Sequence, residues 1–213
     1  MIKSFYFHNF KSFTETELDV SDLTILIGSN ASGKTNVIEA LRILSESAAG
    51  QPLSIIMDGS RNTAGIIRGG SVGCPKIPHT DFELGCTWED NDYKLIYRIK
   101  IDVKNDVQVK NESLIRIFSE KEEKIFDTTN TNDNHIIVEY LSDKYDDYIR
   151  KINLKNNMSI LSQISNFLSN DNKILARSSK DTQALVEALK RMFFFQPKTE
   201  VMRNYVRLGD KTI

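Results

Sequence analysis

A run of small residues that ends in a lysine and a threonine carries the clearest chemistry in this sequence. Two glycines are separated by four residues, and a lysine and a hydroxyl residue follow directly, which is the pattern G-x-x-x-x-G-K-[ST]. Backbone N–H groups in such a loop, at the start of a helix, attract the oxygens of a phosphate. The run is Gly28-Ser29-Asn30-Ala31-Ser32-Gly33-Lys34-Thr35. We therefore predict a phosphate-binding loop (P-loop).

Each fixed position of the loop has a physical role. Gly28 and Gly33 let the backbone turn sharply and approach phosphate oxygens, which a β-carbon would obstruct. Lys34 is expected to reach the β- and γ-phosphates of ATP, and the Thr35 hydroxyl to bind Mg²⁺. The alternative is a glycine-rich turn before a core helix, with a solvated lysine. That alternative explains the glycines but leaves the adjacent Lys-Thr pair to coincidence.

The flanking residues predict the elements that position the loop. Residues 23–27, Leu-Thr-Ile-Leu-Ile, form an unbroken apolar run that predicts a strand. After the loop, apolar residues recur with helical spacing and predict a helix from about residue 33 to 48, ended by Gly50 and Pro52. Two further strands are expected at residues 2–7 and 16–20. We assign residues 1–50 to this strand-loop-helix unit.

Composition excludes several classes of protein. The 213 residues carry a net charge of −1, so no strong overall field attracts nucleic acid or an acidic membrane. Cys74 and Cys86 do not form a C-x-x-C pair, and two reduced thiols are a better interpretation than a disulfide. No run is long and apolar enough for a signal peptide or a membrane span. We expect a soluble cytoplasmic protein without membrane contacts.

Residues 51–80 are rich in glycine and proline among short apolar pieces. We expect an irregular, mobile loop that faces a partner and lies outside the packed core. We expect its apolar residues to be too few and too scattered in sequence to bury a face of their own; they are Ile55, Ile56, Met57, Ile66 and Ile67.

Residues 81–140 alternate apolar and polar positions between short polar turns. This pattern predicts an antiparallel β meander with one wet face, made of segments 81–88, 93–103, 107–118, 124–128 and 135–140. In the second segment Tyr93, Leu95, Tyr97, Ile99 and Ile101 share one side of the strand. That side is expected to face the core.

Residues 141–192 are predicted to be mostly helical. The clearest helix there has Asp181 or Thr182 as its N-cap and an apolar face that includes Leu185 and Leu189. Residues 193–197, Phe-Phe-Phe-Gln-Pro, predict a short buried strand. Residues 193–213 would then hold this strand and the start of a second half.

The N-terminal third resembles a known group of ATPases. The motif Asn-Phe-Lys-Ser-Phe at residues 9–13 and the run Gly-Ser-Asn-Ala-Ser-Gly-Lys-Thr-Asn at 28–36 are similar to the start of an ABC-class ATPase head. The resemblance is to the branch of SMC, RecF and OLD-family proteins and many AAA-type P-loop ATPases of bacterial genome maintenance and phage defence. It covers Asn36, whereas Ala31 stands where glycine is usual. The implied fold is α/β: the N-terminal lobe of a P-loop NTPase, with an antiparallel β meander followed by helices.

Further site residues follow from this resemblance alone. The N-terminal motif lies beside the nucleotide in the family, so Lys11 and Ser12 are candidates for phosphate or base contacts. Arg68, in Ile-Ile-Arg-Gly, could face the nucleotide or a partner. Gln196 matches the glutamine that senses the γ-phosphate through Mg²⁺ and water. The alternatives are a strand-end turn with a solvated lysine, an ordinary loop arginine and a plain strand end.

The second half of an ATPase site is missing from the sequence. Hydrolysis needs an apolar strand that ends in Asp-Glu, for Mg²⁺ and for the attacking water, and no such strand is found. The family's signature motif Leu-Ser-x-Gly and its switch histidine are also missing. We expect the chain to be the first half of a head, with no catalytic residue of its own. The full-length protein would be the ATPase.

The resemblance also implies partners. ATP is sandwiched between two heads in this branch, so we expect a homodimer or a higher oligomer. The heads then act on DNA or on an associated effector such as a nuclease, in bacterial DNA repair or phage defence. Two other hypotheses remain: a nucleotide-gated binding module without hydrolysis, and another P-loop NTPase or kinase. The guanine-reading motif Asn-Lys-x-Asp of GTPases is absent.

Overall fold

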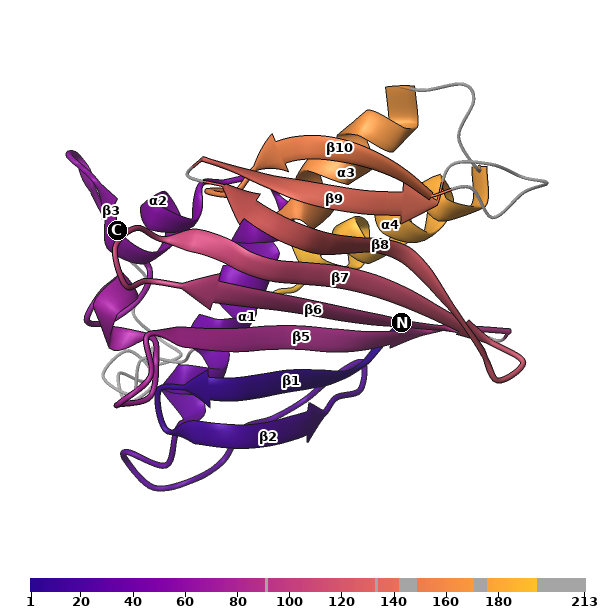
Figure 1. Cartoon of the computed structure of the whole chain (residues 1–213). Coiled ribbons are helices and arrows are strands. Elements are labelled where there is room, and N and C mark those ends of the chain that lie inside the picture. Colours follow the sequence, from indigo (N-terminus) through magenta and orange to yellow (C-terminus); the bar gives the residue numbers. More distant parts are fainter. Residues whose placement is uncertain (91, 133, 142–148, 171–175, 195–213) are drawn as a thin grey trace, which may run out of the picture.

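A computed structural model describes residues 1–90, 92–132, 134–141, 149–170 and 176–194 of the chain. Within them, one large antiparallel sheet carries helices on one face (Figure 1). This mixed α/β architecture agrees with the predicted fold class. None of the described helices combines the length and the apolar character that crossing a membrane requires.

The sheet of the described chain has eight strands in the order β10-β9-β8-β7-β6-β5-β1-β2, and every neighbouring pair is antiparallel. The expected meander is confirmed. β10 lies in a region that was predicted to be mostly helical, so that expectation is wrong there. The strands are β1 (Ile2–Phe10), β2 (Phe13–Asp19), β5 (Asp81–Glu89), β6 (Lys94–Asp102), β7 (Gln108–Phe118), β8 (Lys121–Asn132), β9 (His135–Leu141) and β10 (Ile149–Lys155).

The alternation along β6 shows how the sheet forms its core. Leu95, Tyr97, Ile99 and Ile101 are at most 1% exposed, whereas their neighbours in the strand are half-buried. Successive side chains of a strand point to opposite faces, so one face becomes continuously apolar. Burying such side chains contributes about 1.5–3 kcal/mol each. The prediction that these four residues face the core is confirmed.

Three long helices of the described chain cover the apolar face: α1 (Lys34–Ala48), α3 (Ile160–Asn170) and α4 (Ala176–Lys190) (Figure 1). α1 agrees with the predicted helix. α4 begins earlier than expected, and Asp181 and Thr182 lie inside it, both buried. The cap prediction is therefore wrong. The Thr182 hydroxyl donates to the carbonyl of Ser178 within the helix, and Asp181 pairs with an arginine of the sheet.

Residues 51–80 form short regular elements and contribute buried side chains to the core, which corrects the expectation of an irregular loop outside it. They form α2 (Leu53–Asp58), the hairpin of β3 (Gly59–Ser60) and β4 (Thr63–Ala64), and the short helix η1 (Ser71–Gly73). Ile56, Met57 and Ile67 are at most 5% exposed, whereas Ile55 is 40% exposed. A β-carbon on Gly65 would lie 2.0 Å from the Met57 carbonyl oxygen. Here glycine permits two backbone segments to pack closely. The number of glycines in the sequence had instead suggested an irregular loop.

The apolar run at residues 23–27 is not a strand in the structure, so this prediction is wrong for the described chain. Leu23, Ile25 and Ile27 are 78%, 71% and 90% exposed, while Leu26 packs partly against the core. No other described segment forms backbone hydrogen bonds with residues 24–27. An unbroken apolar run is typical of a strand with a neighbouring strand on each side. None of the described strands pairs with residues 23–27.

The predicted buried strand at 193–197 lies mostly outside the described residues. Phe193 is 86% exposed and, with Phe194, belongs to no strand. Both cysteines are free and buried, as expected for reduced thiols.

A buried carboxylate joins α3 to the sheet. Glu112 of β7 accepts hydrogen bonds from the hydroxyls of Tyr97 and Ser159, and from the backbone N–H groups of Ile160 and Leu161, at 2.7–2.9 Å. Both N–H groups are at the start of α3, where a helix has unpaired donors. Burial raises the pKa of Glu112 to about 7, although these four donors oppose the rise. The carboxylate therefore sets the position of α3.

Because the pKa of Glu112 is higher in the folded protein than in the unfolded chain, stability depends on pH. Between about pH 4.5 and pH 7 the folded state holds a proton that the unfolded state has lost. We predict that the free energy of unfolding falls as pH rises through this window, by on the order of 3 kcal/mol. Urea unfolding at pH 5 and pH 8 checks this, with Glu112→Gln as the control that does not titrate. Equal pH slopes in the two proteins would contradict it.

Candidate functional site

The glycine loop ends at the first turn of α1. Gly33 is the N-cap residue, with φ of 91°, and Ala31 has φ of 65°. The Ser32 N–H donates to the Ser29 carbonyl at 3.3 Å, which closes the loop on itself. Both left-handed residues turn the chain so that the helix begins directly after the loop. Free N–H groups at a helix start are donors for an anion.

Lys34 bends back over the loop. Its ammonium donates to the carbonyl oxygens of Gly28 and Ser29 at 2.7 and 2.6 Å, and to the Ser32 hydroxyl at 3.2 Å. A β-carbon on Gly28 would lie 2.6 Å from the Ser32 hydroxyl oxygen, so this glycine makes room for the folded loop. To bind a phosphate, Lys34 must exchange these neutral acceptors for charged ones. Charge-assisted hydrogen bonds are the stronger kind.

The turn between β1 and β2 packs against the same end of α1. Asn36 donates from its side-chain amide to the Ser12 hydroxyl at 2.9 Å. A β-carbon on Gly33 would meet both Ser12 and the Phe13 ring at 3.4 Å. Phe13 in turn stacks on Phe7 of β1, with ring centroids 5.3 Å apart. The P-loop is therefore in contact with the sheet through Ser12 and Phe13.

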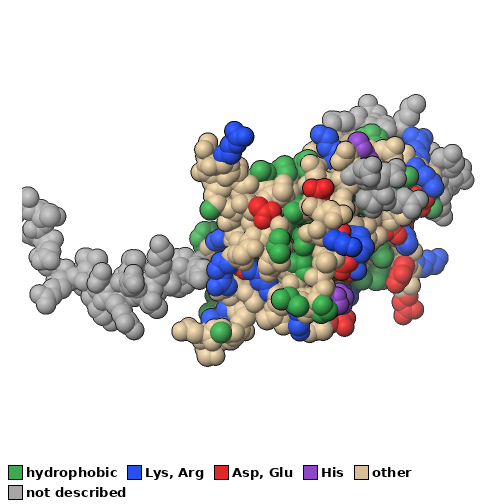
Figure 2. Space-filling model, turned by 60° about the vertical axis from the view of Figure 1, so that its left-hand side comes forward, with side chains coloured by type: hydrophobic (Ala, Val, Ile, Leu, Met, Phe, Trp, Pro, Cys, Tyr) green, Lys and Arg blue, Asp and Glu red, His purple; other side chains and the backbone are tan. Residues whose placement is uncertain are grey.

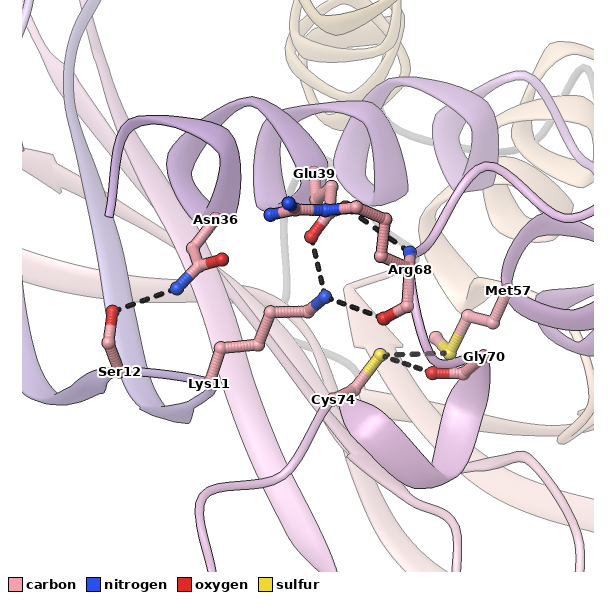
Figure 3. Close-up of polar contacts among 8 residues, drawn as sticks. All are labelled: Lys11, Ser12, Asn36, Glu39, Met57, Arg68, Gly70 and Cys74. Carbon is pink, nitrogen blue, oxygen red and sulfur yellow. Dashed lines mark hydrogen bonds and ion pairs between the residues drawn. The ribbon is translucent and has the colours of Figure 1, made fainter. Parts of the chain in front are cut away.

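A buried glutamate brings the two basic candidates together (Figure 3). Glu39 of α1 is 3% exposed, and its carboxylate lies 2.5 Å from the Lys11 ammonium and 3.0 Å from Nε of Arg68. The Arg68 backbone N–H also donates to it, at 3.2 Å, and Lys11 donates to the Arg68 carbonyl at 2.9 Å. We call these three residues the Glu39 cluster.

The carboxylate of Glu39 is stabilised in its charged form. Burial raises the pKa of Glu39, but the Lys11 ammonium and the donors of Arg68 lower it by more, so the pKa lies below its ordinary value. The contact with Lys11 is an ion pair whose geometry falls short of a hydrogen bond. Two cations share one anion here, which leaves a surplus positive charge.

The sequence had not indicated Glu39. A signal was present, since Asn36 and Glu39 stand three residues apart and so share one face of a helix. Its partners could not be named, because they come from segments far away in the chain.

The structure places most of the predicted site residues at one end of α1. The loop from Gly28 to Gly33 precedes the helix, and Lys34, Thr35 and Asn36 begin it. Lys11 and Ser12 reach it from the β1–β2 turn, and Arg68 from the segment after β4. Gln196 lies outside the described residues.

A family model described as an AAA ATPase domain matches residues 1–201. No curated protein matches the chain.

Ala31 is strained where glycine would not be. Its φ of 65° disfavours any residue with a β-carbon, by about 1 kcal/mol for alanine and more for a β-branched residue. We predict that Ala31→Gly binds ATP equally well or up to about fivefold more tightly, because 1 kcal/mol corresponds to that factor. Ala31→Val is expected to bind at least tenfold more weakly, on the same scale. Titration calorimetry measures the affinity of both variants. Because Ala31 is exposed, neither substitution removes packing. Equal affinities of Ala31→Val and the wild type would therefore refute the argument.

Proposed function

Because the chain belongs to the AAA ATPase domain family, we propose that it is the ATP- and Mg²⁺-binding half of an ABC/SMC-like ATPase head. The observation that carries the proposal is the glycine loop at the start of α1, with Gly33 as N-cap and Lys34 bent over the loop. A loop of this kind offers backbone donors, a helix dipole and a lysine to a single polyphosphate. The SMC, RecF and OLD branch remains a proposal from the motifs at residues 9–13 and 28–36.

The described residues fit one side of a magnesium site. Thr35, the second residue of α1, offers a hydroxyl of the kind that binds Mg²⁺ in P-loops. The described chain contains no group of three or more His, Cys, Asp or Glu residues that could hold a metal by themselves. Mg²⁺ keeps several waters and also binds phosphate oxygens, so few protein ligands are needed. Bound Mg²⁺ would neutralise charge on the β- and γ-phosphates, and we propose Gln196 as its second contact.

Two observations support a half-site. The sequence has no apolar strand that ends in Asp-Glu, so the chain offers no residue to activate water. The apolar residues 23–27 lead straight into the loop but pair with no described strand. Strands of the remaining half would cover them. We propose that hydrolysis requires that half together with a second head, with ATP held between the heads of a homodimer or higher oligomer.

The wider role rests on the family resemblance. We propose that the head works in the cytoplasm and couples ATP to action on DNA or on an effector such as a nuclease, in bacterial DNA repair or phage defence. Figure 2 shows basic and acidic side chains interspersed with apolar ones on the face in view, without a large area of one charge. With a net charge of −1, DNA contact would depend on a local patch or on a partner.

A second candidate function is a nucleotide-gated binding module that does not hydrolyse ATP. The missing catalytic carboxylate favours it. In this case ATP would only order a docking surface around the loop, and the same P-loop residues would bind it.

The binding step is tested at Lys34. We predict that Lys34→Ala lowers ATP affinity about a hundredfold or more, because a charge-assisted phosphate contact is lost. The fold should persist, since Lys34 is a loop-end side chain whose hydrogen bonds all go to its own loop. Calorimetry with ATP and Mg²⁺ measures the affinity, and circular dichroism checks the fold. Unchanged affinity in a folded variant would show that the loop is not the ATP site.

Hydrolysis is tested by the 213-residue chain alone. We predict phosphate release at background rates only, because the sequence has no apolar run that ends in Asp-Glu, the pair that would bind Mg²⁺ and activate water. The control is Lys34→Ala under the same conditions. A rate above background that disappears in this control would contradict the half-site.

A further inference from the structure

The two edges of the large sheet carry opposite charges. β2 and β10 are the outermost of its eight strands and lie at opposite ends of it (Figure 1). Every charged residue of β2 is acidic; these residues are Glu15, Glu17 and Asp19. Every charged residue of β10 is basic; these residues are Arg150, Lys151 and Lys155. The net charge of −1 for the whole chain conceals this separation.

The strand register places most of these charges on one face of the sheet. Leu18 of β2 lies opposite the buried Phe5, and Ile152 of β10 lies opposite the buried Val138, so Leu18 and Ile152 belong to the core face. Successive side chains of a strand alternate between the two faces. The face away from the core therefore carries Glu15, Glu17 and Asp19 at one edge and Lys151 and Lys155 at the other.

β10 has backbone groups that can pair with a further strand. Asn156, directly after β10, donates its backbone N–H to the chain at the start of β9. Backbone direction alternates along an antiparallel strand, so Lys155 points away from β9. In agreement, the Lys155 N–H and carbonyl pair with the side-chain amide of Gln163, at 3.1 and 2.8 Å. By the same alternation Lys151 and Asn153 point away from β9, and no described residue pairs with their backbone groups.

A second copy of the chain fits this edge. Neighbouring strands of the eight-stranded sheet are all antiparallel, so its first and last strands run in opposite directions. A copy displaced along the sheet therefore places its β2 antiparallel to β10. One register then sets Asp19 opposite Lys151 and Glu15 opposite Lys155, and opposite charges in such positions stabilise strand pairing.

The charges also select which edges can meet. Charged residues on an edge strand normally prevent pairing with another sheet. Here like charges would oppose contact of β2 with β2 and of β10 with β10. Contact of β2 with β10 is the one combination that brings opposite charges together, so repulsion and attraction specify the same arrangement.

We propose that β2 of one copy docks on β10 of a second copy, so that the two sheets join head to tail. The complementary edge is on the same molecule, which identifies the partner. A contact of this kind leaves one edge free at each end, so longer chains of copies grow as concentration rises. Two seven-residue strands make a small contact, and the association is therefore weak and dependent on charge. It does not involve the P-loop and goes beyond the proposed function.

Sedimentation velocity of the 213-residue chain without nucleotide tests the proposal. The wild type should form dimers and longer chains as its concentration rises, and fewer of them at high salt. Lys151→Glu combined with Lys155→Glu should weaken this association about tenfold or more, because attraction becomes repulsion. Glu15→Lys combined with Asp19→Lys should have the same effect. The variant with all four substitutions should associate like the wild type, since its edges are again complementary.

The matched control reverses two charges away from the edges. Lys121→Glu combined with Lys124→Glu, in the inner strand β8, changes the net charge as much as the β10 variant does. This control should associate like the wild type, and circular dichroism checks that every variant is folded. A wild type that stays monomeric at all concentrations overturns the proposal. A folded four-residue variant that stays monomeric overturns it as well.

Asn153→Pro separates strand pairing from simple charge attraction. The Asn153 N–H points away from β9, so proline removes a donor only at the outer edge, where strands tolerate it. Association should fall about tenfold or more although the charge is unchanged. Association equal to that of the wild type would show that the edges do not pair as strands and would refute the proposal. The affinity for ATP, tested at Lys34, is measured separately, so the proposed function stands or falls independently.

Discussion

Buried carboxylates with paired donors fix the three long helices of the described chain on the sheet. Glu39 ties α1 to two loops, Glu112 receives the first N–H groups of α3, and Asp181 of α4 pairs with the buried Arg116 of β7. Apolar packing supplies most of the stabilisation but has no direction, so it would tolerate helices that slide or rotate. A buried charge that loses its partners is costly, so each carboxylate permits essentially one placement of its helix. The P-loop begins α1 and therefore inherits its position from Glu39.

The sheet could be predicted from the sequence because its signal is local. Along β6, one apolar residue in two is enough to name both the strand and its buried face. The run at 23–27 failed for the opposite reason, since its strand character depends on neighbours that the described chain does not contain. Glycine misled the prediction at residues 51–80, where it serves close packing, as at Gly65 against Met57. Asp181 looked like a cap because its partner, Arg116, is distant in sequence.

The candidate site also has a part that the sequence predicts and a part that it does not. Its loop was evident from spacing alone, because the residues that bind a phosphate are consecutive and their order is dictated by the backbone. Glu39 was not evident, because its meaning comes from Lys11 and Arg68, which only the fold brings beside it. The resemblance had pointed to both basic residues as candidates, Lys11 for the nucleotide and Arg68 for the nucleotide or a partner. The structure separates them, since the side chain of Lys11 is 10% exposed and paired with Glu39, whereas that of Arg68 is 67% exposed. Gln196 stays a prediction.

Nucleotide binding at this loop would affect the segments at both ends of the loop. Lys34 holds the carbonyl oxygens of Gly28 and Ser29, so a phosphate that draws it away must release the start of the loop. Gly28 directly follows residues 23–27, which are exposed except for the partly buried Leu26, so release of the loop start would also change the position of this segment. At the other end of the loop, Gly33 lies against Ser12 and Phe13, and Phe13 stacks on β1 in the sheet. The loop therefore links the well-packed sheet to an apolar segment that is largely exposed in the described chain, so a rearrangement of the loop would reach both.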